Sequence, residues 1–123
     1  MKLTKHFHIE ELACKCCGQM GFAPDFLQAL ESLRVAYGKP MIVSSGYRCP
    51  KHNGDVSTTG GSGPHTIGAV DVLVRGADAL HLIDVALGAG WTGFGISQKG
   101  ASRFIHLDRL NDVGHPRPII WSY

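Results

Sequence analysis

A stripe of apolar residues at helical spacing is the first pattern in this chain. Between residues 24 and 37 apolar side chains recur every three or four positions and so share one face of a helix: Phe26, Leu30, Leu33 and Tyr37. Proline is favoured in a first helical turn, where Pro24 stands, and Gly38 and Pro40 interrupt the pattern at its other end. The sequence therefore predicts a helix from about Pro24 to Tyr37.

Four short apolar runs with turn residues around them predict β-strands. They are Met41 to Ser45, Ala69 to Val74, Phe94 to Ser97 and Arg103 to Asp108. The last two are separated by the turn-rich segment QKGAS, which favours a hairpin.

A second helix is predicted from Asp78, its expected cap, to about Leu87. Four apolar side chains are expected to face inward from it: Leu80, Ile83, Ala86 and Leu87. The closing segment HPRPIIWSY is too rich in proline for regular structure. We expect its large apolar residues to pack on the core: Ile119, Ile120 and Trp121. These elements predict an α+β fold, with a small, largely antiparallel sheet flanked by helices, in a single domain over residues 1–123.

Composition narrows the class of protein. The chain has 123 residues, of which 44% are hydrophobic and 18% charged, as in an ordinary globular domain. A formal net charge of +2, without any basic run, argues against a nucleic-acid partner. The N-terminal segment has no apolar stretch typical of a secretory signal, and no segment is long and apolar enough to span a membrane. We therefore expect synthesis in the cytoplasm, without membrane insertion.

Polar residues stand where the predicted strands should be apolar. Asp71 is the only acid in the run AVDVLV, and a carboxylate buried there is costly unless it is paired or bound to a cation. His106 alternates with Ile105 and Leu107, so it lies on the face opposite the core. His65 closes a long polar stretch over residues 46–68, a length typical of functional loops.

Two imidazoles and one carboxylate with an open fourth position are the usual ligands of a catalytic zinc ion. His65, Asp71 and His106 are therefore candidate metal ligands. The alternative is that Asp71 pairs with Arg48 or Arg75 and that each histidine is structural.

Three segments resemble the M15 peptidases: SSGYR (44–48), GPHTIGAVDV (63–72) and FIHLD (104–108). This family comprises zinc D-Ala-D-Ala carboxypeptidases and phage endolysin peptidases with a hedgehog-like fold. The cysteine-rich stretch at 13–18 and the ending PRPIIWSY resemble its short phage- and prophage-associated branch. The resemblance implies a monomeric peptidase with one zinc ion per chain. It would hydrolyse peptidoglycan stem peptide or cross-link, and would act on the cell wall after release or an unknown route of export.

Residue by residue, the resemblance assigns the metal to His65, Asp71 and His106. It places Arg48 in the active site, where its charge would stabilise a developing oxyanion. The spacing of six from His65 to Asp71 is one residue shorter than the family's usual pattern, and we expect the turn before the strand to absorb the difference.

The residue three positions before the second histidine is an acid in many relatives and acts there as general base. Here it is Arg103. The nearest acid on the face of His106 is Asp108, which is therefore the candidate to take a proton from the attacking water and pass it to the leaving amine. His115 is the fallback. The alternative for Asp108 is a salt bridge with Arg48 or Arg109.

The missing acid also favours a second interpretation of the whole chain, as a catalytically silent metal-binding or structural module with the same fold. A weaker third one is a wall-binding module without metal.

The cysteines leave several states open. Four are present: Cys14, Cys16, Cys17 and Cys49. Their spacing does not form the two Cys-x-x-Cys pairs typical of structural zinc, and a bridge within the first three would be strained. Reduced thiols, or a bridge to Cys49, are therefore expected before zinc.

Overall fold

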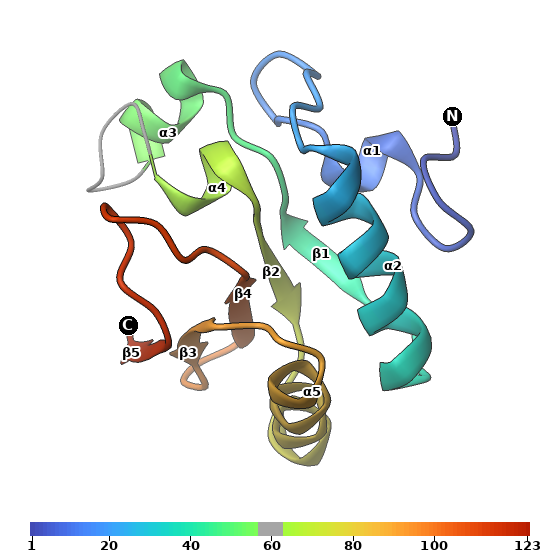
Figure 1. The fold of residues 1–123 in the computed structure, drawn as a ribbon, viewed down its shortest axis with the longest axis vertical. Helices are drawn as coiled ribbons and strands as arrows, with labels where there is room; N and C mark the ends of the chain where they lie inside the picture. Colours follow the sequence, from blue (N-terminus) through green and yellow to red (C-terminus); the bar gives the residue numbers. More distant parts are fainter. Residues whose placement is uncertain (57–62) are drawn as a thin grey trace.

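A computed structural model describes residues 1–56 and 63–123, which form one sheet with helices packed against it (Figure 1). The strands are β1 (Ile42–Ser45), β2 (Ala69–Leu73), β3 (Gly93–Ser97), β4 (Phe104–Asp108) and β5 (Ile119–Ser122). The helices are α1 (Ile9–Leu12), α2 (Pro24–Tyr37), α3 (Pro50–Val56), α4 (Pro64–Ile67) and α5 (Gly76–Gly88). The strand order is β1-β2-β4-β3-β5, with every pair antiparallel except β3 and β5. This confirms the predicted α+β fold.

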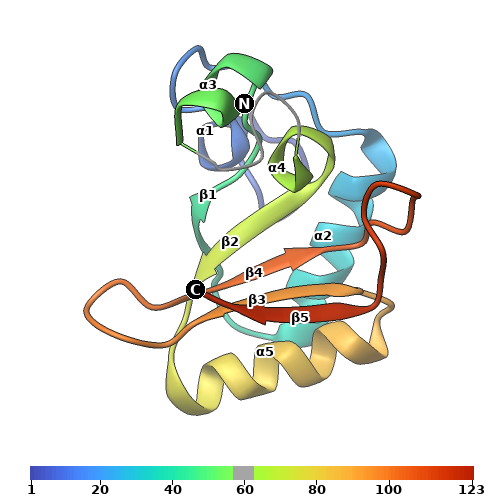
Figure 2. The same ribbon diagram turned by 90° about the vertical axis from the view of Figure 1, so that its left-hand side faces the viewer.

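The core lies between one face of the sheet and the two long helices, which contact each other (Figure 2). Strand residues on this face alternate with residues of the opposite face, as the period of two in a strand requires. Its fully buried members from β2 and β4 are Val70, Val72, Ile105 and Leu107. The opposite face is left for other chemistry.

Helix α2 has the predicted bounds and ends at Gly38 in a left-handed conformation, φ 78°, which glycine adopts without strain. The hairpin of β3 and β4 is also confirmed.

Helix α5 differs from its prediction in start and in buried face. It begins at Gly76, and Asp78 lies in the first turn, where its carboxylate pairs with Lys39 at 2.6 Å. The buried stripe is Ala79, Leu82 and Ala86, whereas Leu80 and Leu87 are 71% and 57% exposed. The prediction for these two leucines was wrong. Alanine at two of the three buried positions lets the helix backbone lie close to its neighbours.

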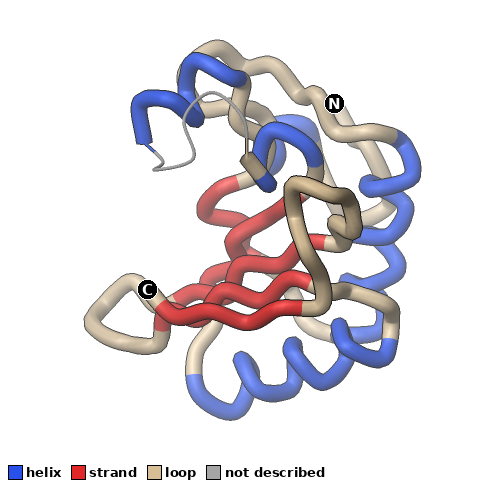
Figure 3. The backbone as a smooth tube through the Cα atoms, turned by 60° about the vertical axis from the view of Figure 1, so that its left-hand side comes forward, coloured by secondary structure: helices blue, strands red, loops and turns tan. Residues whose placement is uncertain are grey.

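The proline-rich tail does form regular structure. Its prolines precede β5, which pairs with β3 at the edge of the sheet, where the C-terminus also lies (Figure 3). Proline is tolerated just before an edge strand because no ladder hydrogen bond is lost. Ile119 and Ile120 are 42% and 67% exposed, so the expectation that they pack on the core was wrong.

The polar stretch at 46–68 contains α3 and α4, and its residues 57–62 lie outside the described part. Within 1–56 and 63–123, no helix has the length and apolar character to cross a membrane.

Candidate metal centre

A single row of paired residues crosses all five strands on the face opposite the core. In strand order the row is Ser45, Asp71, His106, Gly95 and Trp121. Residues paired directly across strands have side chains about 5 Å apart on one face. Register alone therefore brings Asp71 beside His106.

His65 reaches the same place from α4, the short helix that leads into β2. Its Nε2 lies 3.2 Å from Oδ1 of Asp71, and Nδ1 of His106 lies 3.3 Å from the same oxygen. The three ligand atoms all lie within 4.8 Å of one another. The three residues are 2–7% exposed, so the cluster is shielded from solvent.

The second nitrogen of each imidazole is already used. Nδ1 of His65 donates to the backbone oxygen of Gly46 at 2.9 Å, and Nε2 of His106 donates to Asp108 at 2.8 Å. In the neutral rings the nitrogens that face Asp71 must then carry lone pairs. Oδ1 of Asp71 is buried, and no described residue donates a hydrogen bond to it. Three electron-pair donors thus converge, and a cation between them would satisfy all three, so these residues fit a zinc ion.

Protons compete for the same position. Burial raises the pKa of Asp71, but His106 and His65 hold it well below its usual range. Burial lowers the pKa of His106, yet the carboxylates of Asp108 and Asp71 raise it overall. Without a metal, the cluster therefore favours a protonated His106 beside an ionised Asp71.

Arg48 adds a positive charge at the edge of the cluster. Its Nη2 lies 3.8 Å from Oδ2 of Asp71, and its Nε donates to Ser45 Oγ at 3.1 Å. Its backbone N–H donates to the carbonyl of His65 at 3.0 Å. The ion pair of Asp71 with Arg48 and the histidine cluster are therefore both present.

A family model described as Peptidase M15 matches residues 5–108, which include Arg48, His65, Asp71 and His106. The chain belongs to the M15 peptidase family. A search of curated proteins finds no match. Membership of the M15 family indicates a hydrolase of the metallopeptidase type and agrees with the fold.

Asp108 lies on the side of the His106 ring away from the three ligand atoms. It is fully buried. Arg117 donates two hydrogen bonds to it, from Nε at 2.9 Å and from Nη2 at 2.8 Å, and the N–H of Leu110 donates a third at 3.3 Å. Burial raises its pKa, but His106 and Arg117 lower it to about 2. The general-base role that strand alternation suggested for Asp108 does not fit these contacts. The expected salt bridge does exist, but its partner is Arg117 rather than Arg48 or Arg109.

The residues that support this arrangement escaped the sequence interpretation. A side chain at Gly93 would overlap the Asp108 carboxylate, and one at Gly95 would meet the Trp121 ring at 2.7 Å. Trp121 covers His106, with ring centroids 4.8 Å apart. Two glycines at alternate positions of β3 signal close approach on one face, and this pattern was available in the sequence.

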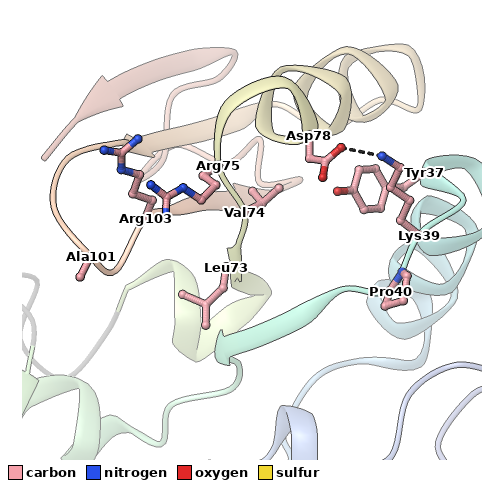
Figure 4. Close-up of a pocket in the computed structure, with 9 residues that line it drawn as sticks. All are labelled: Tyr37, Lys39, Pro40, Leu73, Val74, Arg75, Asp78, Ala101 and Arg103. Carbon is pink, nitrogen blue, oxygen red and sulfur yellow. Dashed lines mark hydrogen bonds and ion pairs between the residues drawn. The ribbon is translucent and has the colours of Figure 1, made fainter.

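Arg103 does not join the cluster. It lines a hollow near the opposite end of β4, together with Lys39, Arg75 and Asp78 (Figure 4). His115, the fallback base, donates from Nδ1 to the carboxylate of Asp112 at 2.8 Å in the loop before β5. The position that carries an acid in many M15 relatives therefore contributes no carboxylate here.

Proposed function

We propose that this chain is a zinc-dependent peptidase that hydrolyses bacterial peptidoglycan stem peptide or cross-link. The observation that carries the proposal is the convergence of His65, Asp71 and His106 on one buried point, with both imidazole lone pairs aimed at an unsatisfied carboxylate oxygen. A zinc ion held there would supply Lewis-acid chemistry: it would polarise a peptide carbonyl and lower the pKa of a bound water to about 7.

The chain's own residues position this chemistry. The Gly46 carbonyl and the Asp108 carboxylate each hold one imidazole in the tautomer that leaves its ligand nitrogen free. Arg117 holds Asp108 in turn, because a buried carboxylate needs a charged partner.

Arg48 is proposed to stabilise negative charge on the carbonyl oxygen of the substrate. Its side chain is 18% exposed, and its guanidinium lies beside the proposed ligand Asp71. A fixed positive charge there stabilises the negative charge that develops on the carbonyl oxygen during attack. A purely structural ion pair with Asp71 predicts a different outcome, since its loss would lower stability and not turnover.

Asp108 is proposed as a positioning residue for His106 and not as the proton carrier. Both of its oxygens accept hydrogen bonds from buried groups, so a proton from an attacking water has no free site on it. Its lowered pKa agrees, because a general base near pH 7 works best with a pKa near that value.

A second candidate function follows from the same observation. If no other group carries the proton, the chain is a metal-binding or structural module with the M15 fold and without hydrolytic activity. Two observations favour this module: Asp108 is paired with Arg117, and Arg103 lies away from the metal cluster.

Zymography on purified cell walls separates the two. The peptidase is expected to clear the wall, to stop after chelation and to recover when zinc is added, whereas His106→Ala stays inactive throughout. A folded, zinc-loaded protein that clears walls of no stem-peptide type would support the silent module. The proposal includes a phage or prophage origin and leaves open which wall and which peptide bond are cut. The assay therefore uses walls of several cross-link types.

A further inference from the structure

The four cysteines gather at one place although one of them is far away in sequence. Cys14, Cys16 and Cys17 lie in the loop after α1, and Cys49 lies just before α3. Their four Sγ atoms all lie within 4.8 Å of one another. Sγ of Cys16 is 3.2 Å from that of Cys49 and 3.5 Å from that of Cys14. None of the four is in a disulfide.

The spacing of the sulfur atoms is close to that of a tetrahedral zinc site. Zinc–sulfur bonds of about 2.3 Å place the ligands of a tetrahedral site about 3.8 Å apart. A disulfide has its sulfurs about 2.05 Å apart and joins only two of four thiols. Four sulfurs around one point are the complete ligand set of a structural site.

The backbone of the loop also fits a metal site. Cys14 and Cys17 form one Cys-x-x-Cys pair followed by Gly18, whose φ of 77° lets the chain turn back tightly. The turn is closed by the N–H of Gly18, which donates to the carbonyl of Cys14 at 2.8 Å. This arrangement aims both sulfurs to the same side.

Two backbone N–H groups point at the sulfur atoms. The N–H of Cys49 donates to Sγ of Cys14 at 3.3 Å, and that of His52 donates to Sγ of Cys49 at 3.4 Å. Such donors stabilise a thiolate, the form that binds metal, more than a neutral thiol. Both sulfurs are buried, since Cys14 and Cys49 are 3% and 6% exposed.

We propose that Cys14, Cys16, Cys17 and Cys49 bind a second, structural zinc ion. Four protein ligands leave no open position, which is typical of structural and not catalytic zinc. The expected content rises from one zinc per chain to two. The sequence had favoured reduced or bridged thiols, because it did not reveal that Cys49 lies beside the loop.

This zinc would tie the N-terminal loop to the segment that carries Arg48. The N–H of Tyr47 already donates to the carbonyl of Leu12 at 2.8 Å, and a side chain at Gly46 would meet that carbonyl oxygen at 2.6 Å. Gly46 in turn accepts the hydrogen bond from His65. The structural site thus holds the strand end from which one catalytic ligand takes its orientation.

The test uses the double variant His65→Ala/His106→Ala, which removes the other metal site and leaves the cysteines intact. After purification with reductant and zinc, we expect one zinc per chain, surrounded by four sulfurs at about 2.3 Å in X-ray absorption at the zinc edge. Adding Cys17→Ser is expected to remove that signal, and the matched control Lys15→Ser, in the same exposed loop, is expected to keep it.

A double variant without zinc, in which all four thiols are alkylated in the folded state, would overturn the proposal. So would a zinc ion with only nitrogen and oxygen ligands, a Cys16–Cys49 disulfide in the reduced preparation, or iron in place of zinc. The zinc–sulfur signal is measured in a variant with all four cysteines intact, so it can be read even if the cysteine variants fold poorly. The result is also separate from the peptidase proposal: a wild type with two zinc ions and no hydrolysis contradicts only the peptidase.

Discussion

The substitution Asp108→Asn separates the positioning role of this residue from the proton-carrying role that the sequence suggested. It keeps the shape of the side chain and removes its charge. Four hydrogen bonds from three groups converge on the carboxylate: His106, Arg117 through two nitrogens, and the N–H of Leu110. An amide oxygen can keep accepting some of them, but it no longer balances the guanidinium.

The size of the effect follows from what is left unpaired. The Arg117 side chain is only 6% exposed, and removing one partner of a buried ion pair costs about 3–5 kcal/mol. That is a large part of the roughly 5–15 kcal/mol by which domains are stable. Losing the partner that orients a ligand histidine also lowers metal affinity by about 10–100-fold.

Two measurements on one preparation test this. Denaturant unfolding of Asp108→Asn is expected to show a loss of about 3 kcal/mol, and competition with a chelator of known affinity is expected to show the weaker zinc binding. Turnover should recover largely at saturating zinc. The control is Asp84→Asn, the same change at an exposed position of α5, for which we expect neither effect.

The opposite pattern would refute the reasoning. If Asp108→Asn keeps its stability and zinc affinity but loses on the order of a hundredfold in turnover at saturating zinc, the residue carries the proton after all.

Three further outcomes are expected. Burial raises the pKa of Glu31, but hydrogen bonds from Thr4 and His6 lower it to about 2. The stability that ionised Glu31 contributes is therefore present above about pH 4 and is lost as the pH falls toward 2. Glu31→Gln should cost about 2 kcal/mol at pH 7 in denaturant unfolding, and an unchanged midpoint would contradict this. Gly93→Ala should lower the melting temperature by several degrees, because the new methyl group overlaps a buried carboxylate; calorimetry that finds no change would show that β3 can shift. Zinc affinity at the histidine site should fall as the pH drops through the raised pKa of His106, since the metal must displace that proton; chelator competition with a constant affinity from about pH 8 to 5.5 would argue against it.

Local patterns predicted the parts of the fold that depend on local rules. The period of two in β4 placed His106 opposite Ile105, and the structure has this arrangement. The stripe from Phe26 to Tyr37 predicted α2 with its bounds, because proline and glycine end a helix for reasons carried by those residues alone.

The role of Asp108 could not be predicted in the same way, because its partner comes from another part of the chain. Arg117 lies in the tail, whose prolines suggested irregular structure, and β5 forms only because the edge of β3 is available for pairing. The cysteine cluster is a similar case, since Cys49 is 35 residues from Cys14 in the sequence and lies beside it only in the folded chain.

The most direct test of the central claim is the zinc content of single-ligand variants by elemental analysis. His65→Ala and His106→Ala are each expected to hold one zinc ion per chain fewer than the wild type under identical purification, while remaining folded by circular dichroism. Retention in Asp71→Ala alone would mean that the short turn before β2 has moved this carboxylate out of bonding range of the metal. Wild-type zinc content in both histidine variants would contradict the assignment of the metal centre itself.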